Sequence, residues 1–158
     1  MDEQRFMTYI RDNQGLLNKL IGLYATDREE KKDLYQEVLY QSWNARNSYR
    51  NEAKFSTWLY RVCLNTILSH KRKKKLVHYT EDIEPLAPSI KPHADATEDS
   101  RRLYQAIRQL AESDRAIISL HLDGYDNSEI GEIVGISTGN VAVKIHRIKD
   151  QLNKLLKN

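Results

Sequence analysis

Residues 55–75, FSTWLYRVCLNTILSHKRKKK, are the stretch around which the rest of the chain is organised. The spacing of their hydrophobic side chains, near 100° per residue, predicts one helix with two different faces. Ser56 is expected to cap its N-terminus, because a side-chain hydroxyl can accept a backbone N–H at that position. One face gathers small and apolar side chains, which are Leu59, Val62, Cys63, Thr66 and Ile67.

The opposite face of this predicted helix carries groups that contact phosphates or bases. These groups belong to Trp58, Arg61, Asn65, Ser69 and Arg72. A basic run, residues 70–75, then closes the stretch. A core helix with a solvated basic end would give the same pattern, so the choice between the two interpretations depends on the rest of the chain.

The charge of the chain is unevenly distributed. The 158 residues carry a net charge of +3, but residues 1–75 carry +6, residues 76–100 carry −5 and residues 101–158 carry +2. This alternation predicts two modules joined by an acidic segment. Basic surfaces attract polyanions, among which nucleic acid is the commonest. An anionic membrane surface is the rival partner, but the basic run lacks the broad apolar face of a helix that lies on a membrane.

Composition favours an all-α protein with two small helical domains, because the chain has only three prolines and six glycines and little β-branched alternation. No apolar run is long enough to span a bilayer and the N-terminus does not resemble a signal peptide, so we expect a cytoplasmic protein. The single cysteine, Cys63, is expected to be a small core residue rather than a redox sensor.

Enzymatic and metal-binding functions have no support in the sequence. The five histidines are scattered, and no pair of them has zinc-ligand spacing with the single cysteine. Phosphate-binding glycine loops, dinucleotide-binding glycine runs and nucleophile elbows do not occur. We therefore expect no catalytic residues, no metal and no cofactor.

Two helices are predicted before the organising stretch. The first runs over Glu3–Tyr24 and the second over about Arg28–Asn47, with Asp27 and Glu30 as a capping box. The second helix is expected to bury a stripe made of Leu34, Val38, Gln41 and Ala45. Residues 47–54 then form a polar break.

Residues 76–96 contain all three prolines and most of the nearby acidic residues, and they predict an extended linker. The chain is thereby divided into residues 1–75, a linker over 76–96 and a second module over 97–158. In the second module, Thr97 and Ser113 are expected to cap the first two helices.

The sequence DNSEIGEIVGISTGNVAVKIHRIKDQL, residues 126–152, predicts a helix-turn-helix. Gly131 supplies a small residue where two helices meet, and Gly135 supplies the turn. Opposite the buried stripe of the second helix we expect Asn140, Lys144 and Arg147, with His146 and Lys149 placed for phosphate contacts. An ordinary helical hairpin is the alternative.

The first module resembles region 2 of the extracytoplasmic-function (ECF) sigma factors of the sigma-70 family. The similar run is DLYQEVLYQSWNARNSYRNEAKFSTWLYRVCLNTILSHKRKK, residues 33–74, and residues 101–156 are similar to region 4 of that family. Members typically have an Asp-x-x-Gln-Glu opening, a following aromatic residue, an aromatic-Arg loop, an F-x-T-W-L-Y-R run, an Asn and a basic tail. The resemblance covers nearly the whole chain in the order that the family has.

The resemblance implies a division of roles among these residues. The second helix would dock on the clamp helices of the β′ subunit of core RNA polymerase, through Asp33, Gln36, Glu37, Trp43 and Arg46. The −10 element would be melted and held by Tyr49, Arg50, Phe55, Trp58, Arg61, Asn65, Ser69, Lys71 and Arg72. Region 4 would touch the β-flap and read the −35 element through Ser137, Thr138, Asn140, Lys144, His146 and Arg147.

The resemblance also bears on the acidic linker, on a regulatory partner and on one residue that differs from the family pattern. The acidic linker could mimic RNA in the polymerase cleft, or it could simply be a solvated segment. An anti-sigma factor is a possible partner. Relatives commonly have Arg or Lys where this chain has Ala142, so a contact made there would be lost or moved to Lys144.

Two other classes of protein fit the sequence less well than a sigma factor. A two-domain helix-turn-helix regulator independent of core polymerase would need a sensor domain, and 75 helical residues hold neither a pocket-forming sheet nor a phospho-acceptor domain. A scaffold that binds only protein would leave the basic face of residues 55–75 unexplained.

Overall fold

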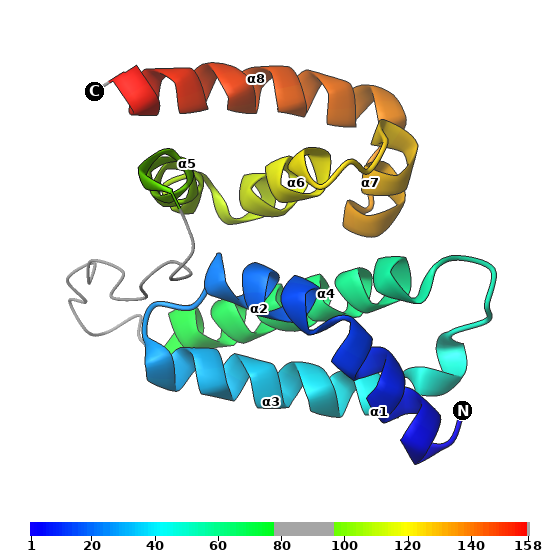
Figure 1. The fold of residues 1–158 in the computed structure, drawn as a ribbon. Helices are drawn as coiled ribbons and strands as arrows, with labels where there is room; N and C mark the ends of the chain where they lie inside the picture. Colours follow the sequence, from blue (N-terminus) through cyan, green and yellow to red (C-terminus); the bar gives the residue numbers. More distant parts are fainter. Residues whose placement is uncertain (78–96, 158) are drawn as a thin grey trace. The chain divides into compact units, whose positions relative to one another are not determined.

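The computed structural model describes residues 1–77 and 97–157, and every regular element in these two ranges is a helix (Figure 1). Contacts divide the chain into two compact units, Met1–Ile90 and Lys91–Asn158. The predicted all-α fold with two helical domains is confirmed. Residues 76 and 77 belong to the last turn of a helix, and the remainder of the predicted linker, with its three prolines, lies outside the described residues.

The first unit is a bundle in which one long helix, α4, packs against α2 and α3. Its helical elements are α1 (Glu3–Asp12), α2 (Gln14–Gly22), α3 (Arg28–Asn44), the short 3₁₀ helix η1 (Arg46–Ser48) and α4 (Phe55–Val77). The apolar face predicted for α4 lies in the core, where Leu59, Cys63 and Ile67 are fully buried. Tyr60 and Leu64 are buried as well, so this face is wider than the predicted strip.

The prediction of one helix over residues 3–24 is wrong, because the chain breaks at Asn13. The backbone of Asn13 leaves the helical region (φ −113°, ψ 20°), and its side-chain Nδ2 donates a hydrogen bond to the Tyr9 carbonyl oxygen at 2.8 Å. An asparagine side chain that bonds to nearby backbone offers the chain an alternative to continuing the helix. The apolar side chains that recur at helical spacing are nevertheless buried on both sides of this break, and they are Phe6, Ile10, Leu17, Leu20, Ile21 and Tyr24.

The predicted bounds of the next two helices also shift. Helix α3 ends at Asn44 rather than Asn47, and it buries Ser42 where Gln41 was expected. Helix α4 already begins at Phe55, so Ser56 lies inside its first turn and is not the N-cap. The cap at Asp27 is confirmed, since its carboxylate accepts the Glu30 backbone N–H at 2.8 Å.

The second unit places three shorter helices against one long one. Its elements are α5 (Glu98–Arg108), α6 (Glu112–Leu122), α7 (Asn127–Val134) and α8 (Thr138–Lys157), and α8 packs on the other three. Hydrogen bonds confirm Thr97 as a helix cap. Ser113 is not a cap, because α6 begins one residue earlier and Ala111 takes that position without a side-chain bond.

The turn between α7 and α8 confirms the predicted helix-turn-helix. Gly135 ends α7 with φ +81°, a left-handed conformation that glycine adopts without steric cost. A Cβ atom on Gly131 would lie only 2.5 Å from the Ile136 carbonyl oxygen, so the close approach of the chain requires a glycine there. Asp126 and Ser137 cap α7 and α8 through hydrogen bonds to the backbone N–H groups of Glu129 and Asn140.

Candidate nucleic-acid interface

A row of polar side chains follows the outer face of α4. Arg61, Asn65, Ser69 and Arg72 are all exposed, and their spacing of three or four residues aligns them along one side of the helix. Four of the five residues predicted for this face are therefore exposed, whereas the fifth, Trp58, is half-buried. The row presents two guanidinium groups, an amide and a hydroxyl, which can bond to phosphates and to base edges.

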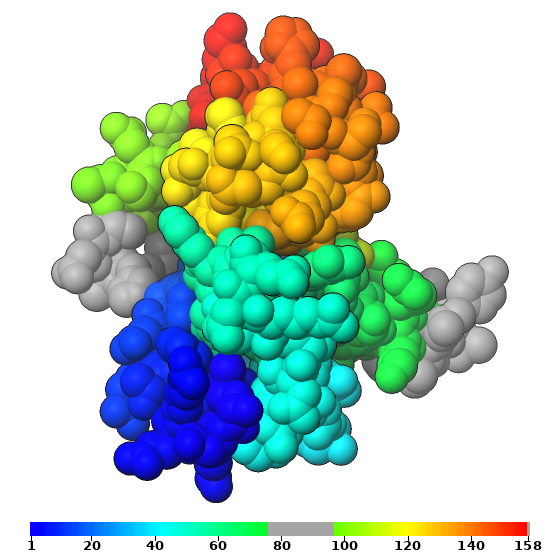
Figure 2. All heavy atoms as spheres, turned by 90° about the vertical axis from the view of Figure 1, so that its right-hand side faces the viewer, coloured from blue at the N-terminus to red at the C-terminus, as the bar shows by residue number. Residues whose placement is uncertain are grey.

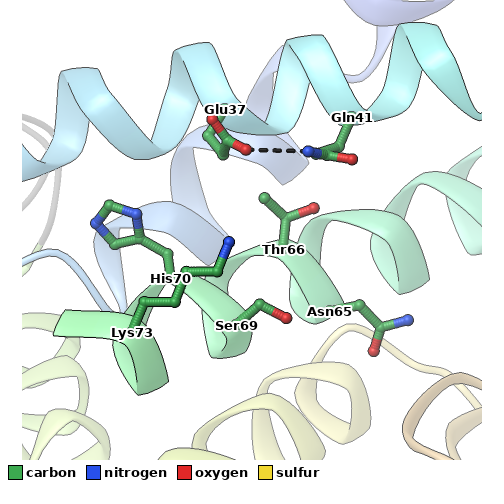
Figure 3. Close-up of a pocket in the computed structure, with 7 residues that line it drawn as sticks. All are labelled: Glu37, Gln41, Asn65, Thr66, Ser69, His70 and Lys73. Atoms are coloured by element: carbon green, nitrogen blue, oxygen red, sulfur yellow. Dashed lines mark hydrogen bonds between the residues drawn. The ribbon is translucent and has the colours of Figure 1, made fainter. Parts of the chain in front are cut away.

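A polar hollow of about 430 Å³ opens between α3 and α4 beside this row (Figure 3). Its wall on α3 consists of Glu37 and Gln41, joined by a 3.0 Å hydrogen bond from Gln41 Nε2 to a Glu37 carboxylate oxygen. The wall on α4 consists of Asn65, Thr66, Ser69, His70 and Lys73. The hollow therefore offers both donors and acceptors to a polar group of the size of a nucleobase.

Four aromatic rings gather where the loop after α3 meets α4. Phe55 is at their centre and is 7% exposed, with ring centroids of Tyr9, Tyr49 and Trp58 at 4.7, 5.3 and 5.2 Å. Burial makes Phe55 the support of this cluster, so its ring is not open to a base as the resemblance implied. Tyr49 and Trp58 are half-buried and keep part of their rings accessible, and Arg50 is exposed beside them.

The loop between α3 and α4, residues 45–54 (the connecting loop), is held by hydrogen bonds to this cluster. Trp58 Nε1 donates to Ser48 Oγ at 3.1 Å, and the Tyr49 hydroxyl donates to the Ala53 carbonyl oxygen at 3.0 Å. Asn51 sits in the left-handed region with φ +59°, which asparagine tolerates better than most residues. The loop that was predicted as a polar break therefore has a defined conformation.

Two lysines of the basic run, residues 70–75, form ion pairs within the protein. The buried carboxylate of Glu30 on α3 pairs with Lys71 and Lys74. Lys71 is 11% exposed, so it does not belong with the open cations as the resemblance implied, whereas Arg72 does. Burial raises the pKa of Glu30, but the two ammonium groups outweigh that effect and bring its pKa below the ordinary value.

The role of Glu30 as the partner of two lysines could not be predicted from the sequence, because its position fits an ordinary capping box. Its carboxylate does reach back to the Thr26 backbone N–H at 3.2 Å, as a capping glutamate does. Nothing in the local sequence indicates that the same carboxylate also binds two lysines more than 40 positions later.

The predicted polymerase-binding residues on α3 fall into two groups. Asp33, Gln36 and Glu37 are exposed on one side of the helix. Tyr40, which was not predicted, lies four residues after Gln36 on the same side and is 61% exposed. The helical spacing from Gln36 could have identified it, and a large exposed aromatic ring is typical of a binding surface.

Trp43 and Arg46 make contacts within the first unit. The Arg46 guanidinium stacks 3.7 Å from the centre of the Trp43 ring and donates to the Trp43 carbonyl oxygen at 2.8 Å. The Trp43 ring meets Phe6 edge-on at 5.2 Å. The structure thus brings these two residues together against α1 rather than beside Asp33, Gln36 and Glu37.

Helix α8 buries Val141, Ile145, Ile148 and Leu152 and exposes its opposite side. Thr138, Asn140, His146 and Arg147 are exposed as expected, and Ser137 is exposed while its hydroxyl caps the helix. Lys144 lies on the flank, with its ammonium 3.9 Å from an Asp114 carboxylate oxygen on α6. Val143, which was not predicted, is 55% exposed and faces outward.

The described residues differ from what a metal site, a membrane-spanning helix or a reactive cysteine would need. No group of three or more potential ligands in residues 1–77 and 97–157 could hold a metal ion. None of the described helices combines the length and the apolar character needed to cross a membrane. Cys63 is fully buried, and burial raises the pKa of its thiol well above the usual range, as expected for a core residue.

Family models match both units of the chain. The sigma-70 region 2 model matches residues 9–77, and the sigma-70 region 4 model matches residues 100–152. The ECF RNA polymerase sigma factor SigW of Bacillus subtilis is 33% identical over 144 residues, which cover 82% of this chain and 76% of SigW. The ECF sigma factor SigM of Mycobacterium tuberculosis is 24% identical and aligns with 98% of this chain and 79% of its own.

The fold is also found among solved structures. The sigma factor RpoE of Bartonella quintana, solved in complex with the anti-sigma factor NepR, superimposes with a TM-score of 0.84. The two chains share 20% identity, and the match covers 98% of each. The chain belongs to the ECF sigma factors of the sigma-70 family. Proteins of this class bind core RNA polymerase and direct it to promoter DNA, so the rival prediction of an independent regulator is not favoured.

Proposed function

We propose that three surfaces of this sigma factor divide its work, with polymerase docking on α3, −10 capture on α4 and the connecting loop, and −35 reading on α8. The observation that carries the proposal is the exposed row Arg61, Asn65, Ser69 and Arg72, which runs beside the polar hollow in Figure 3. The proposed division of the chain keeps two modules, with the first extended to Val77 at the end of α4 and the second over residues 97–158.

The −10 surface combines two kinds of contact. The accessible parts of Tyr49 and Trp58 can stack on unpaired bases, at about 1–3 kcal/mol for each base. Asn65 and Ser69 line the hollow and can bond to the edge of a base that has left the duplex, and unpairing that base costs a few kcal/mol. Arg50, Arg61 and Arg72 would follow the strand's phosphates. Phe55 and Lys71 are assigned to supporting this surface.

The docking surface on α3 consists of Asp33, Gln36, Glu37 and Tyr40. It presents two carboxylates around an exposed aromatic ring, and such a ring supplies much of the affinity in many protein interfaces. Trp43 and Arg46 would act indirectly, by fixing the C-terminal end of α3 against α1.

The −35 surface consists of Thr138, Asn140, Val143, His146 and Arg147. Asparagine and arginine side chains can bond to adenine and guanine edges in the major groove, and the Val143 methyl groups can contact a thymine methyl. Lys144 is assigned to the flank of α8, beside Asp114.

We further propose a cytoplasmic location, no enzymatic activity of the chain itself and control by an anti-sigma factor. A protein that binds core polymerase and promoter DNA has to share their compartment. The anti-sigma proposal rests on the fold shared with a sigma factor that was solved with such a partner.

A pair of substitutions tests the division between docking and −10 capture. Asp33→Ala should weaken assembly with core polymerase, because it removes an exposed carboxylate from the docking surface. Asn65→Ala should leave assembly unchanged and slow open-complex formation. Assembly is measured by fluorescence anisotropy with core polymerase, and opening by permanganate reactivity of unpaired thymines. If Asn65→Ala impairs assembly as strongly as opening, the residue has a folding role and the assignment is wrong.

A further inference from the structure

Helix α1 contacts two residues that flank the connecting loop, Trp43 near the end of α3 and Phe55 at the start of α4. At the entry, Phe6 packs edge-on against Trp43, with 5.2 Å between ring centroids and 66° between ring planes. At the exit, Tyr9 stacks on Phe55 at 4.7 Å and 22°. Phe6 and Tyr9 are three residues apart and therefore lie on the same side of α1. Figure 2 shows α1 in dark blue next to the loop region in cyan on one face of the first unit.

The contact between Tyr9 and Phe55 extends to the rings that remain accessible. Phe55 touches Tyr49 edge-on and Trp58 at a tilt of 41°, and these two rings contact each other at 5.8 Å. Trp58 in turn bonds to Ser48 within the loop. Phe55 is thus in direct contact with both accessible aromatic rings.

Tyr9 also contacts a neighbour on its own helix. Arg5, one turn earlier on α1, places its guanidinium carbon 5.7 Å from the centre of the Tyr9 ring and donates a hydrogen bond to the Tyr9 hydroxyl at 3.3 Å. Tyr9 is half-buried, and its ring is nearly parallel to that of Phe55. Tyr9 therefore contacts both Arg5 and Phe55, and these contacts limit the motion of the stacked pair of rings.

We propose that Tyr9 is a positioning residue for −10 capture, acting through Phe55 to hold Tyr49 and Trp58 in the orientation that accepts unpaired bases. This inference rests on the function proposed above for Tyr49 and Trp58. Without the Tyr9 ring, Phe55 would lose its outer partner, and the two accessible rings would have to be ordered during DNA capture. In the wild-type protein, helix α1 would thus assist promoter opening through Tyr9 without contacting DNA itself.

Three substitutions on α1 separate this role from general stability. Tyr9→Ala removes the stacked ring. Tyr9→Phe keeps the stack and removes only the hydroxyl bonded to Arg5. Met7→Ala alters a residue on the same helix that is 45% exposed, and it serves as the control. Each holoenzyme is tested for assembly with core polymerase and for affinity to a single-stranded non-template −10 oligonucleotide.

The expected result is a loss of affinity for single-stranded DNA without a loss of assembly with core polymerase. Tyr9→Ala should bind the oligonucleotide about tenfold more weakly, because two side chains must be ordered on binding. Its assembly with core polymerase should stay at the wild-type level, since the docking surface on α3 is unchanged. Tyr9→Phe and Met7→Ala should bind the oligonucleotide as the wild type does. Unchanged affinity in Tyr9→Ala, or an equal loss of assembly, would overturn the proposal.

A second readout needs no DNA. The chain has two tryptophans, and 5-fluorotryptophan gives each one a ¹⁹F resonance that can be assigned with Trp43→Phe and Trp58→Phe. Tyr9→Ala should shift or broaden the Trp58 resonance and leave that of Trp43 in place. An unchanged Trp58 resonance would overturn the positioning role. Failure of the wild-type holoenzyme to bind the −10 strand, with a shifted Trp58 resonance in the variant, would instead contradict the proposed function.

Discussion

The carboxylate of Glu30 binds the ammonium group of Lys71, which lies 41 residues later in the chain. The same carboxylate binds Lys74 one turn further along α4. The start of α3 is thereby fastened to the basic end of α4, and Lys71 is turned away from the exposed polar row that includes Arg72. One buried glutamate thus takes Lys71 out of the exposed part of the basic run, while Lys74 pairs with it from the surface.

Replacing Glu30 with Gln should destabilise the first unit by about 1.5–3 kcal/mol at neutral pH, the range for hydrogen bonds to charged groups. The pKa of Glu30 is lower in the folded protein than its ordinary value of 4.5, so its stabilising effect is complete above that value. The effect is lost as the pH falls through the lowered folded pKa. Hydrogen exchange of first-unit amides should therefore show a gap between wild type and variant that narrows in acid. A gap that widens in acid would contradict the pairing.

Neighbouring basic residues should respond differently to the same substitution. Lys71→Ala should reduce the stability of the first unit, because it removes a partner of the buried Glu30 carboxylate. Arg72→Ala should leave stability unchanged and weaken promoter binding. The slope of log affinity against log salt concentration should fall by about one, the value for one lost phosphate contact. Thermal unfolding and filter binding at several salt concentrations measure the two effects. The same loss of DNA affinity in both variants would mean that Lys71 also contacts DNA.

Alanine substitutions at two glycines of the helix-turn-helix should change the stability of the second unit in opposite directions. Gly131→Ala should destabilise the second unit by about 1–3 kcal/mol, because the new Cβ would clash with the Ile136 carbonyl oxygen. Gly139→Ala has open space around it and should stabilise α8 by up to about 1 kcal/mol. Hydrogen exchange of α7 and α8 amides checks both. Equal stability of the two variants would show that the turn tolerates a side chain at position 131.

The two cations predicted to face the −35 element should differ in importance. Arg147→Ala should weaken binding to a −35 duplex by about 1–3 kcal/mol for a lost base contact. Lys144→Ala should have a smaller effect, since its ammonium lies beside Asp114 on the flank of α8. Lys154→Ala, an exposed cation seven residues after Arg147, is the control for net charge. A larger loss in Lys144→Ala would mean that this side chain leaves Asp114 to contact DNA.

Most of the fold could be predicted because its patterns are local. Helical periodicity placed the core residues Leu59, Cys63 and Ile67, and capping residues placed the starts of α3 and α5. The break at Asn13 was missed, because apolar spacing continues across it and the hydrogen bond from Asn13 to Tyr9 has no counterpart in a periodicity pattern.

The site was predicted less completely, because its features depend on contacts between distant segments. The exposure of Asn65 and Arg147 follows from their own helices and was predicted correctly. The burial of Phe55 depends on Tyr9, and the pairing of Lys71 depends on Glu30. A sequence pattern within one helix cannot reveal which side chain another helix places against it.

We conclude that this chain confers promoter recognition on core RNA polymerase, and run-off transcription with purified core polymerase is the decisive experiment. The full chain is mixed with core polymerase, and the assembled complex is isolated and supplied with a library of genomic fragments. We predict stable co-purification and transcripts that start downstream of one shared pair of −10 and −35 sequences. A chain that binds duplex DNA but neither assembles with core polymerase nor yields such transcripts would contradict the claim.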